Sequence, residues 1–251
     1  MKAKKHLGQH FLIDKGVINE IIESIGKYCS KDMPLLEVGP GMGVLTHQLV
    51  EQFPLLKAIE FDADMVRVLV DNIPGIKILN EDFLSSDLST LFTGQAFNLV
   101  GNFPYNISSQ IIFKMIKNVE LIENMVGMFQ KEVASRICAV PGNKNNGILS
   151  LRIQAHYTTH HLFDIGPEAF NPPPKVQSSV IFLKRKDEYH INCNEALYGQ
   201  IIKTAFQQRR KKMRNTLKTM VDDLTDPIFQ KRPEELNVED FVNITKIVEN
   251  Q

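Results

Sequence analysis

The chain has 251 residues, of which 43% are hydrophobic and 23% charged, and its formal net charge is zero. This composition is typical of a globular protein with a sizeable core, and no apolar run approaches the roughly 18 residues that span a bilayer. The basic N-terminus lacks the apolar region of a signal peptide. Three scattered cysteines, Cys29, Cys138 and Cys193, argue against a disulfide framework or a metal site. We therefore expect a cytoplasmic protein without membrane contact.

The first two-thirds of the chain alternate between helical and strand-like patterns. A helix is expected over residues 16–28, because its apolar residues share one face and Asp14 can cap its first turn. Four more helices are expected over 44–52, 63–72, 109–119 and 130–138, and another follows the loop at 141–147. Strands are expected over 34–39, 56–61, 76–82, 97–102, 124–129, 160–166 and 178–186. This alternation predicts a parallel sheet covered on both faces, and so an α/β fold.

The strand signal ends near residue 187. Residues 194–206, the basic stretch 203–218 and residues 238–250 all show helical patterns. We therefore expect a sheet domain over 1–187 and a small all-helical domain over 188–251. Three consecutive prolines within 167–177 predict a stiff extended connector.

The first expected strand runs into a glycine-rich turn, EVGPGMG. Glycines at 39, 41 and 43 allow positive φ and let the backbone approach a ligand. In an open α/β sheet this turn lies at the carboxyl edge, where ligands bind. The spacing is G-x-G-x-G rather than the G-x-G-x-x-G of dinucleotide enzymes, and a tight strand-to-helix turn would also explain it.

Two acidic residues follow the next two strands. Glu60 can accept hydrogen bonds from a ribose diol, and Asp82 can accept one from an adenine amino group, because an ionised carboxylate only accepts. Taken singly, each is better explained as a solvated loop carboxylate. Together with Gly39 and Gly41 they predict a cofactor that contains adenosine, which leaves S-adenosylmethionine and NAD.

The end of the fourth strand decides between these cofactors. In the segment LVGNFPYNIS, Asn102 supplies an amide oxygen, Pro104 fixes φ and thereby the direction of neighbouring carbonyls, and Tyr105 can stack on a base for roughly 1–3 kcal/mol. The exocyclic amine of adenine is a poor nucleophile, since its lone pair is delocalised into the ring. Two acceptors on its two N–H bonds would aim that lone pair at a sulfonium methyl group. The pattern thus favours S-adenosylmethionine and requires no metal, although a turn with two core aromatics is the other explanation.

The chain resembles the small-subunit ribosomal RNA adenine N6,N6-dimethyltransferases, the KsgA family, nearly end to end. The resemblance is carried by KKHLGQHFL, EVGPGMGVLT, AIEFD, EDF, GNFPYNIS, FNPPPKVQSSVI, AFQQRRKKMRNTL and LNVEDF. It implies a Rossmann-like S-adenosylmethionine-dependent methyltransferase sheet with a small C-terminal all-helical domain. It further implies a set of cofactor-binding residues, namely His10, Leu12, Gly39, Gly41, Glu60, Asp82 and Asn102.

The resemblance also concerns the base. It implies that Phe170 is the second aromatic of the base sandwich and faces Tyr105, whereas the residues alone favour an ordinary core position for Phe170. Phe103 stands where the family usually has leucine. We expect this difference to alter the shape of the pocket slightly and to leave the chemistry intact.

Positive charge is concentrated in residues 203–218, which hold seven basic residues and no acidic one. Five cations fall within six positions: Arg209, Arg210, Lys211, Lys212 and Arg214. On a helix they would cover most of its surface, which suits contacts to phosphates better than a bland solvated face. Three lysines in MKAKKH add to this charge. The resemblance implies as partner the small-subunit rRNA of an immature 30S particle, with two adjacent adenosines dimethylated in a hairpin near its 3′ end.

Three alternatives stay open from the sequence. The related large-subunit rRNA methyltransferases share most of these motifs, but FNPPPKVQSSV and LNVEDF are more similar to the small-subunit group. A non-catalytic RNA-binding assembly or transcription factor could use the same fold. An NAD-dependent oxidoreductase is disfavoured by the glycine spacing. Without heptads or unused apolar stripes, we expect a monomer.

Overall fold

The structure is a computed structural model that describes residues 10–251, so the lysines of MKAKKH and the first part of KKHLGQHFL lie outside the described residues. The chain forms two compact units. One comprises Met1–Ala134 and Thr159–Arg185, and the other Ser135–Thr158 and Lys186–Gln251. Residues 135–158, which the expected division at 187/188 assigns to the first domain, thus group with the C-terminal unit. The reason is packing, because Leu151 and Ala155 share a hydrophobic core with the C-terminal helices.

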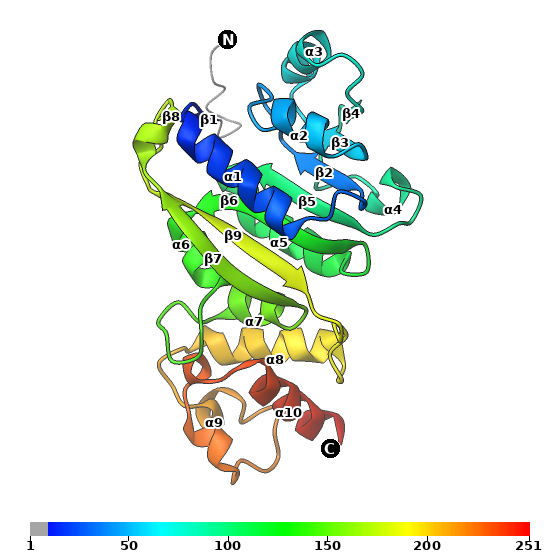
Figure 1. Ribbon diagram of the computed structural model, residues 1–251. Helices are drawn as coiled ribbons and strands as arrows, with labels where there is room; N and C mark the ends of the chain where they lie inside the picture. The colour runs from blue at the N-terminus through cyan, green and yellow to red at the C-terminus, as the bar shows by residue number, and fades with distance from the viewer. Residues whose placement is uncertain (1–9) are drawn as a thin grey trace. The chain divides into compact units, whose positions relative to one another are not determined.

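Within the described residues, seven strands form one sheet (Figure 1). Its order is β4 (Ile78–Leu79), β3 (Leu56–Ile59), β2 (Leu35–Val38), β5 (Phe97–Asn102), β6 (Ile122–Gln130), β9 (Ser178–Arg185), β7 (Tyr157–Ile165). Neighbours from β4 to β6 pair in parallel, whereas β9 is antiparallel to β6. The expectation of a parallel sheet is therefore correct for those five strands and wrong for β9.

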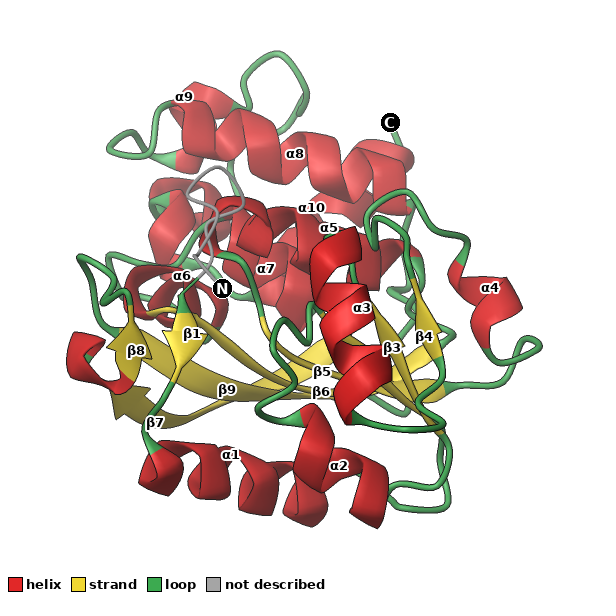
Figure 2. Ribbon diagram, turned by 90° about the horizontal axis from the view of Figure 1, so that it is seen from above, coloured by secondary structure: helices red, strands yellow, loops and turns green. Residues whose placement is uncertain are grey.

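Helices cover both faces of the sheet, with α1 in front of it and α5 behind it in Figure 1, and α1 and α2 together below it in Figure 2. The first unit contains α1 (Lys15–Tyr28), α2 (Thr46–Gln52), α3 (Ala63–Asn72), α4 (Leu88–Leu91) and α5 (Ser108–Lys117), and α6 (Lys131–Ile137) runs from it into the second. Because both faces are covered, β2 is buried along its whole length and β5 up to its last residue. After β2 the chain adds β3 and β4 on one side, then returns to add β5 on the other. The carboxyl ends of β2 and β5 therefore flank a switch point, where open α/β sheets bind ligands.

Helix α1 begins where the sequence predicts. The side chain of Asp14 caps it by accepting a hydrogen bond of 3.0 Å from the Val17 amide. Its apolar face is buried against the sheet through Ile18, Ile21, Ile22 and Ile25.

Two short strands that the sequence does not predict lie beside the sheet. β1 (Phe11–Leu12) pairs antiparallel with β8 (Phe170–Asn171), with Phe11 opposite Asn171 and Leu12 opposite Phe170. The expected extended connector thus contains part of a ladder, and its Asn171–Pro172 bond is cis. This pairing joins the start of the described chain to a segment about 160 residues later and positions His10 for the site described below.

The second unit is built around α7 (Ile148–Gln154), α8 (Glu195–Gln207), α9 (Met213–Thr216) and α10 (Val238–Glu249). The expectation of one helix through the basic stretch is wrong, because α8 ends at Gln207 and residues 208–212 form a turn. Like charges three and four residues apart destabilise a helix, which disfavours a helix through the basic residues. The next helix, α9, begins at Met213, which is fully buried.

We expect Asp14→Ala to lower the free energy of unfolding by about 1 kcal/mol, because it removes the cap of α1. Chemical denaturation measures this change. Asp14→Asn keeps a capping oxygen and should stay close to wild type, so an equal loss in both variants would contradict the role of the cap.

Candidate active site

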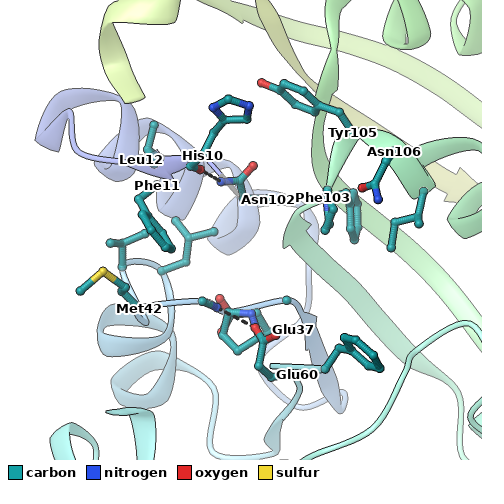
Figure 3. A pocket seen from close by; sticks show the side chains of 18 of the residues that line it. His10, Phe11, Leu12, Glu37, Met42, Glu60, Asn102, Phe103, Tyr105 and Asn106 are labelled. Carbon is teal, nitrogen blue, oxygen red and sulfur yellow. Dashed lines mark hydrogen bonds between the residues drawn. The ribbon is translucent and has the colours of Figure 1, made fainter. Parts of the chain in front are cut away.

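A cavity of about 260 Å³ opens at the carboxyl ends of β2, β3 and β5 (Figure 3). Residues of the predicted site that line it are His10, Leu12, Gly39, Gly41, Glu60, Asp82, Asn102, Pro104 and Tyr105. The structure therefore gathers all but one of the residues assigned to cofactor or base from the sequence, and the exception is Phe170.

The glycine-rich turn lines this cavity. Gly39 and Gly41 have φ of +67° and +57°, a region that residues with a side chain rarely adopt. The Gly41 amide donates a hydrogen bond of 3.0 Å to Oε2 of Glu60, and the Asp62 amide donates one of 2.9 Å to Oε1. Burial raises the pKa of Glu60, and these amide hydrogen bonds oppose the rise. The carboxylate thus fixes the turn and retains lone pairs for a ligand.

A second buried acid that the sequence analysis misses also lines the cavity. Glu37 is 1% exposed, and within residues 10–251 no hydrogen bond reaches its Oε2. Burial raises its pKa to about 7, the Thr46 hydroxyl opposes the rise, and the charge of Glu60 adds to it. The signal was present in the sequence, since Glu37 is the one charged residue in the apolar strand LLEV.

Asn102 ends β5 with its amide group in a defined orientation. Its Nδ2 donates a hydrogen bond of 3.3 Å to the carbonyl of His10, which leaves Oδ1 as the acceptor at the cavity (Figure 3). The carbonyl of Pro104 accepts two hydrogen bonds of 3.2 Å, from the Ile107 amide and the Ser108 hydroxyl. Both lone pairs of that carbonyl are therefore used inside the protein.

Tyr105 begins a short 3₁₀ helix, η2 (Tyr105–Ile107), and lies beside Asn102. Its hydroxyl shares a hydrogen bond of 2.5 Å with that of Ser178. The His10 ring stacks on it, with ring centroids 5.6 Å apart and an interplanar angle of 27°. A hydrogen bond of 2.8 Å between Nδ1 of His10 and the carbonyl of Pro172 fixes the imidazole. One face of Tyr105 is thus already covered by a ring.

Phe170 lies elsewhere. It is 3% exposed and packs in the core with Leu12 and Ile165, and it is not among the residues lining the cavity. Its strand pairing with Leu12 accounts for this position. Here His10, not Phe170, is the ring against Tyr105.

Further apolar residues that were not predicted from the sequence complete the cavity wall. Phe61 is 64% exposed, and Phe11 and Met42 lie near the glycine turn. The sequence held a signal for Phe61, because an aromatic residue directly after the strand-end Glu60 lies beyond the buried part of the strand. Together these side chains offer apolar contact to a planar ring.

The five basic residues belong to the second unit. Arg210, Lys211, Lys212 and Arg214 are exposed, whereas Arg209 is partly buried and lies 3.8 Å from a carboxylate oxygen of Glu234. Four exposed cations in and beside one turn form a concentrated positive surface.

Comparison with known proteins reveals extensive similarity. The family model for ribosomal RNA adenine dimethylases matches residues 1–249. A ribosomal RNA small subunit methyltransferase A from Bacteroides thetaiotaomicron is 48% identical over 99% of this chain and 95% of its own length. The protein of the same name from Flavobacterium johnsoniae is 46% identical over 99% and 97%.

Solved structures share the fold. A dimethyladenosine transferase from Plasmodium falciparum matches with a TM-score of 0.78 and 24% identity, over 95% of this chain and 99% of its own. The 23S rRNA methyltransferase ErmE matches with a TM-score of 0.71 and 22% identity, over 94% and 99%. Among the described residues, no helix is long and apolar enough to cross a membrane.

Glu37 should give this protein a distinctive dependence of stability on pH. Its pKa is raised from 4.5 to about 7 in the folded state, so the folded protein binds more protons than the unfolded chain between these values. The stabilising contribution is then fully present below about pH 4.5 and is lost as pH rises through about 7, on the order of 1–3 kcal/mol.

Glu37→Gln removes the titration and should flatten this loss, as measured by denaturation between pH 5 and 8. Glu51→Gln, at an exposed position of α2, serves as the control and should keep the wild-type profile. An unchanged profile in Glu37→Gln would contradict the raised pKa.

Proposed function

Because this chain belongs to the ribosomal RNA adenine dimethylase family, we propose that its cavity holds S-adenosylmethionine and a flipped adenine side by side. It is an rRNA adenine dimethyltransferase, and its small-subunit relatives direct the assignment to 16S rRNA. The observation that carries the proposal is the orientation of Asn102, whose amide oxygen faces the cavity while its nitrogen is engaged with His10.

The acidic lining of the cavity fits a cationic cofactor. Glu37 carries a buried oxygen without a partner among the described residues, and Glu60 and Asp82 line the same space. A buried carboxylate is costly unless a positive charge or hydrogen-bond donors meet it. When bound, S-adenosylmethionine supplies a methyl group activated by the positive sulfur. Glu60 would then accept from the ribose, and Asp82 from the adenine amine of the cofactor.

Two acceptors hold the amine of the target adenine. Oδ1 of Asn102 is one of them. The carbonyl of Pro104 is saturated by Ile107 and Ser108, so the neighbouring carbonyl of Phe103 is the second. Holding both N–H bonds localises the nitrogen lone pair and directs it for in-line attack, so that positioning provides most of the catalysis.

Tyr105 provides the stacking surface for this adenine. Its hydroxyl is fixed by Ser178, so the plane of the ring is set before RNA arrives. A base that stacks on Tyr105 displaces the imidazole of His10 from that face or shares the ring with it. Stacking on an uncovered ring contributes roughly 1–3 kcal/mol, and the gain is smaller where the base replaces the imidazole.

The basic surface of the second unit would bind the rRNA backbone. Arg210, Lys211, Lys212 and Arg214 are exposed, and Arg can form two hydrogen bonds with one phosphate group. We propose that the protein acts as a monomer on an immature 30S particle, in the cytoplasm where such particles are assembled.

We expect Asn102→Ala to slow methyl transfer by about 100-fold or more, because one of two acceptors that act in the transition state is lost. The assay follows labelled methyl groups from S-adenosylmethionine into small-subunit particles that lack the modification. RNA binding should be retained, and Asn72→Ala, at an exposed position of α3, is the matched control.

The same assay separates the competing functions. Full activity of Asn102→Ala would refute the catalytic assignment, and an inactive wild type that still binds RNA would indicate an assembly factor. Labelling of large-subunit particles instead would identify the large-subunit activity.

Replacing Arg210, Lys211 and Lys212 together with glutamine should weaken RNA binding and reduce its salt dependence. Each lost phosphate contact lowers the slope of log K against log salt by about 0.7–0.9. Filter binding at several salt concentrations measures the slope. Replacing the exposed Lys15, Lys27 and Lys31 of the first unit removes equal charge, and an equal effect there would show that only net charge matters.

A further inference from the structure

Phe103 lines the cavity, and its ring is buried on the sheet beside it. It is 1% exposed and lies against Phe129 of β6, with ring centroids 5.0 Å apart at 46°. The amide of Phe103 donates a hydrogen bond of 3.2 Å to the carbonyl of Met128. The residue between Asn102 and Pro104 is therefore held at both its ring and its backbone by β6.

Two glycines make room for this ring. Gly101 of β5 and Gly127 of β6 are directly opposite each other in the parallel ladder. A Cβ added at Gly127 would overlap Cε2 of Phe103, and one added at Gly101 would lie 3.0 Å from Cε1. The paired glycines thus leave a flat area on the sheet that the ring occupies.

The two glycines differ in what else they serve. A Cβ at Gly101 would also lie 2.6 Å from the carbonyl of Val38, so Gly101 is needed for the close approach of β2 to β5. At Gly127 the obstacles are side chains, those of Phe103 and Met125. Its φ does not fall in the left-handed region, so alanine suits the backbone there and conflicts only with the space the ring fills.

We infer that Gly127 is a positioning residue for methyl transfer, which acts by seating the ring of Phe103 and so fixing the carbonyl of Phe103 and the amide of Asn102 that receive the target amine. This inference rests on the proposed function. A side chain at Gly127 would lift the ring from the sheet and carry the adjoining acceptors with it. Displacement of reacting groups by about 1 Å costs on the order of 100-fold in rate.

A double-mutant cycle tests the inference. Gly127→Ala should lower kcat for methyl transfer about 100-fold, while the affinity for S-adenosylmethionine, measured by calorimetry, stays within about twofold. Adding Phe103→Leu to Gly127→Ala shortens the side chain and should restore kcat roughly tenfold or more, a coupling expected only of residues in contact. Gly26→Ala in α1, where an added Cβ meets only a flexible side-chain atom at 3.8 Å, is the control and should match wild type.

The outcomes separate this inference from the proposed function. Failure of the wild type to transfer methyl groups refutes the function. If the wild type is active, the proposed function stands and three results refute the inference alone. These are an unchanged kcat in Gly127→Ala, a cofactor affinity that falls in parallel with the rate, and no recovery of kcat when Phe103→Leu is added. Should Gly127→Ala not fold, Phe103→Ala alone decides. It removes the ring and leaves the glycine area empty, so it should lose kcat with unchanged cofactor affinity, and wild-type kcat would overturn the inference.

Discussion

Parallel pairing of β2 with β3 and β5 is the constraint on which the site depends. It brings the ends of three strands to one edge, so the glycine turn, Glu60 and Asn102 meet although they are distant in sequence. Hydrogen bonds then fix each part, since Glu60 holds the amide of Gly41 and Asn102 holds the carbonyl of His10. None of these contacts survives a slip of one residue, because a slip in register turns every side chain of a strand to the opposite face.

The same edge brings acidic side chains together in buried positions. Glu37 and Glu60 are both buried, and the charge of Glu60 adds to the cost of ionising Glu37. In the free protein this cost is lowered by backbone amides at Glu60, whereas Oε2 of Glu37 receives no hydrogen bond from the described residues. A ligand with positive charge gains from this arrangement, and a neutral product of methyl transfer gains less. Under the proposed function, the distribution of acids therefore favours the cationic cofactor over its uncharged product.

Much of this arrangement could be predicted from the sequence because it depends on local signals. Strand ends, glycines and single acids are visible in a short window, and they place Gly39, Glu60, Asp82 and Asn102 correctly in the cavity. What could not be predicted depends on contacts between distant segments. The β1–β8 ladder decides that Phe170 enters the core and that His10 meets Tyr105, and the shared core of α7 and α8 decides where residues 135–158 belong. The turn at 208–212 was not predicted because a charge run fits a helical period even where repulsion between its like charges disfavours a helix.

The imidazole stacked on Tyr105 has a consequence for selectivity. Because the imidazole of His10 already stacks on Tyr105, a purine that takes its place gains only the difference in stacking free energy between the two rings. A free nucleoside would therefore gain little at this position, and retention must come from the polynucleotide to which the base is attached. Under the proposed function, occupancy of the pocket is thereby linked to recognition of the RNA strand that carries the base.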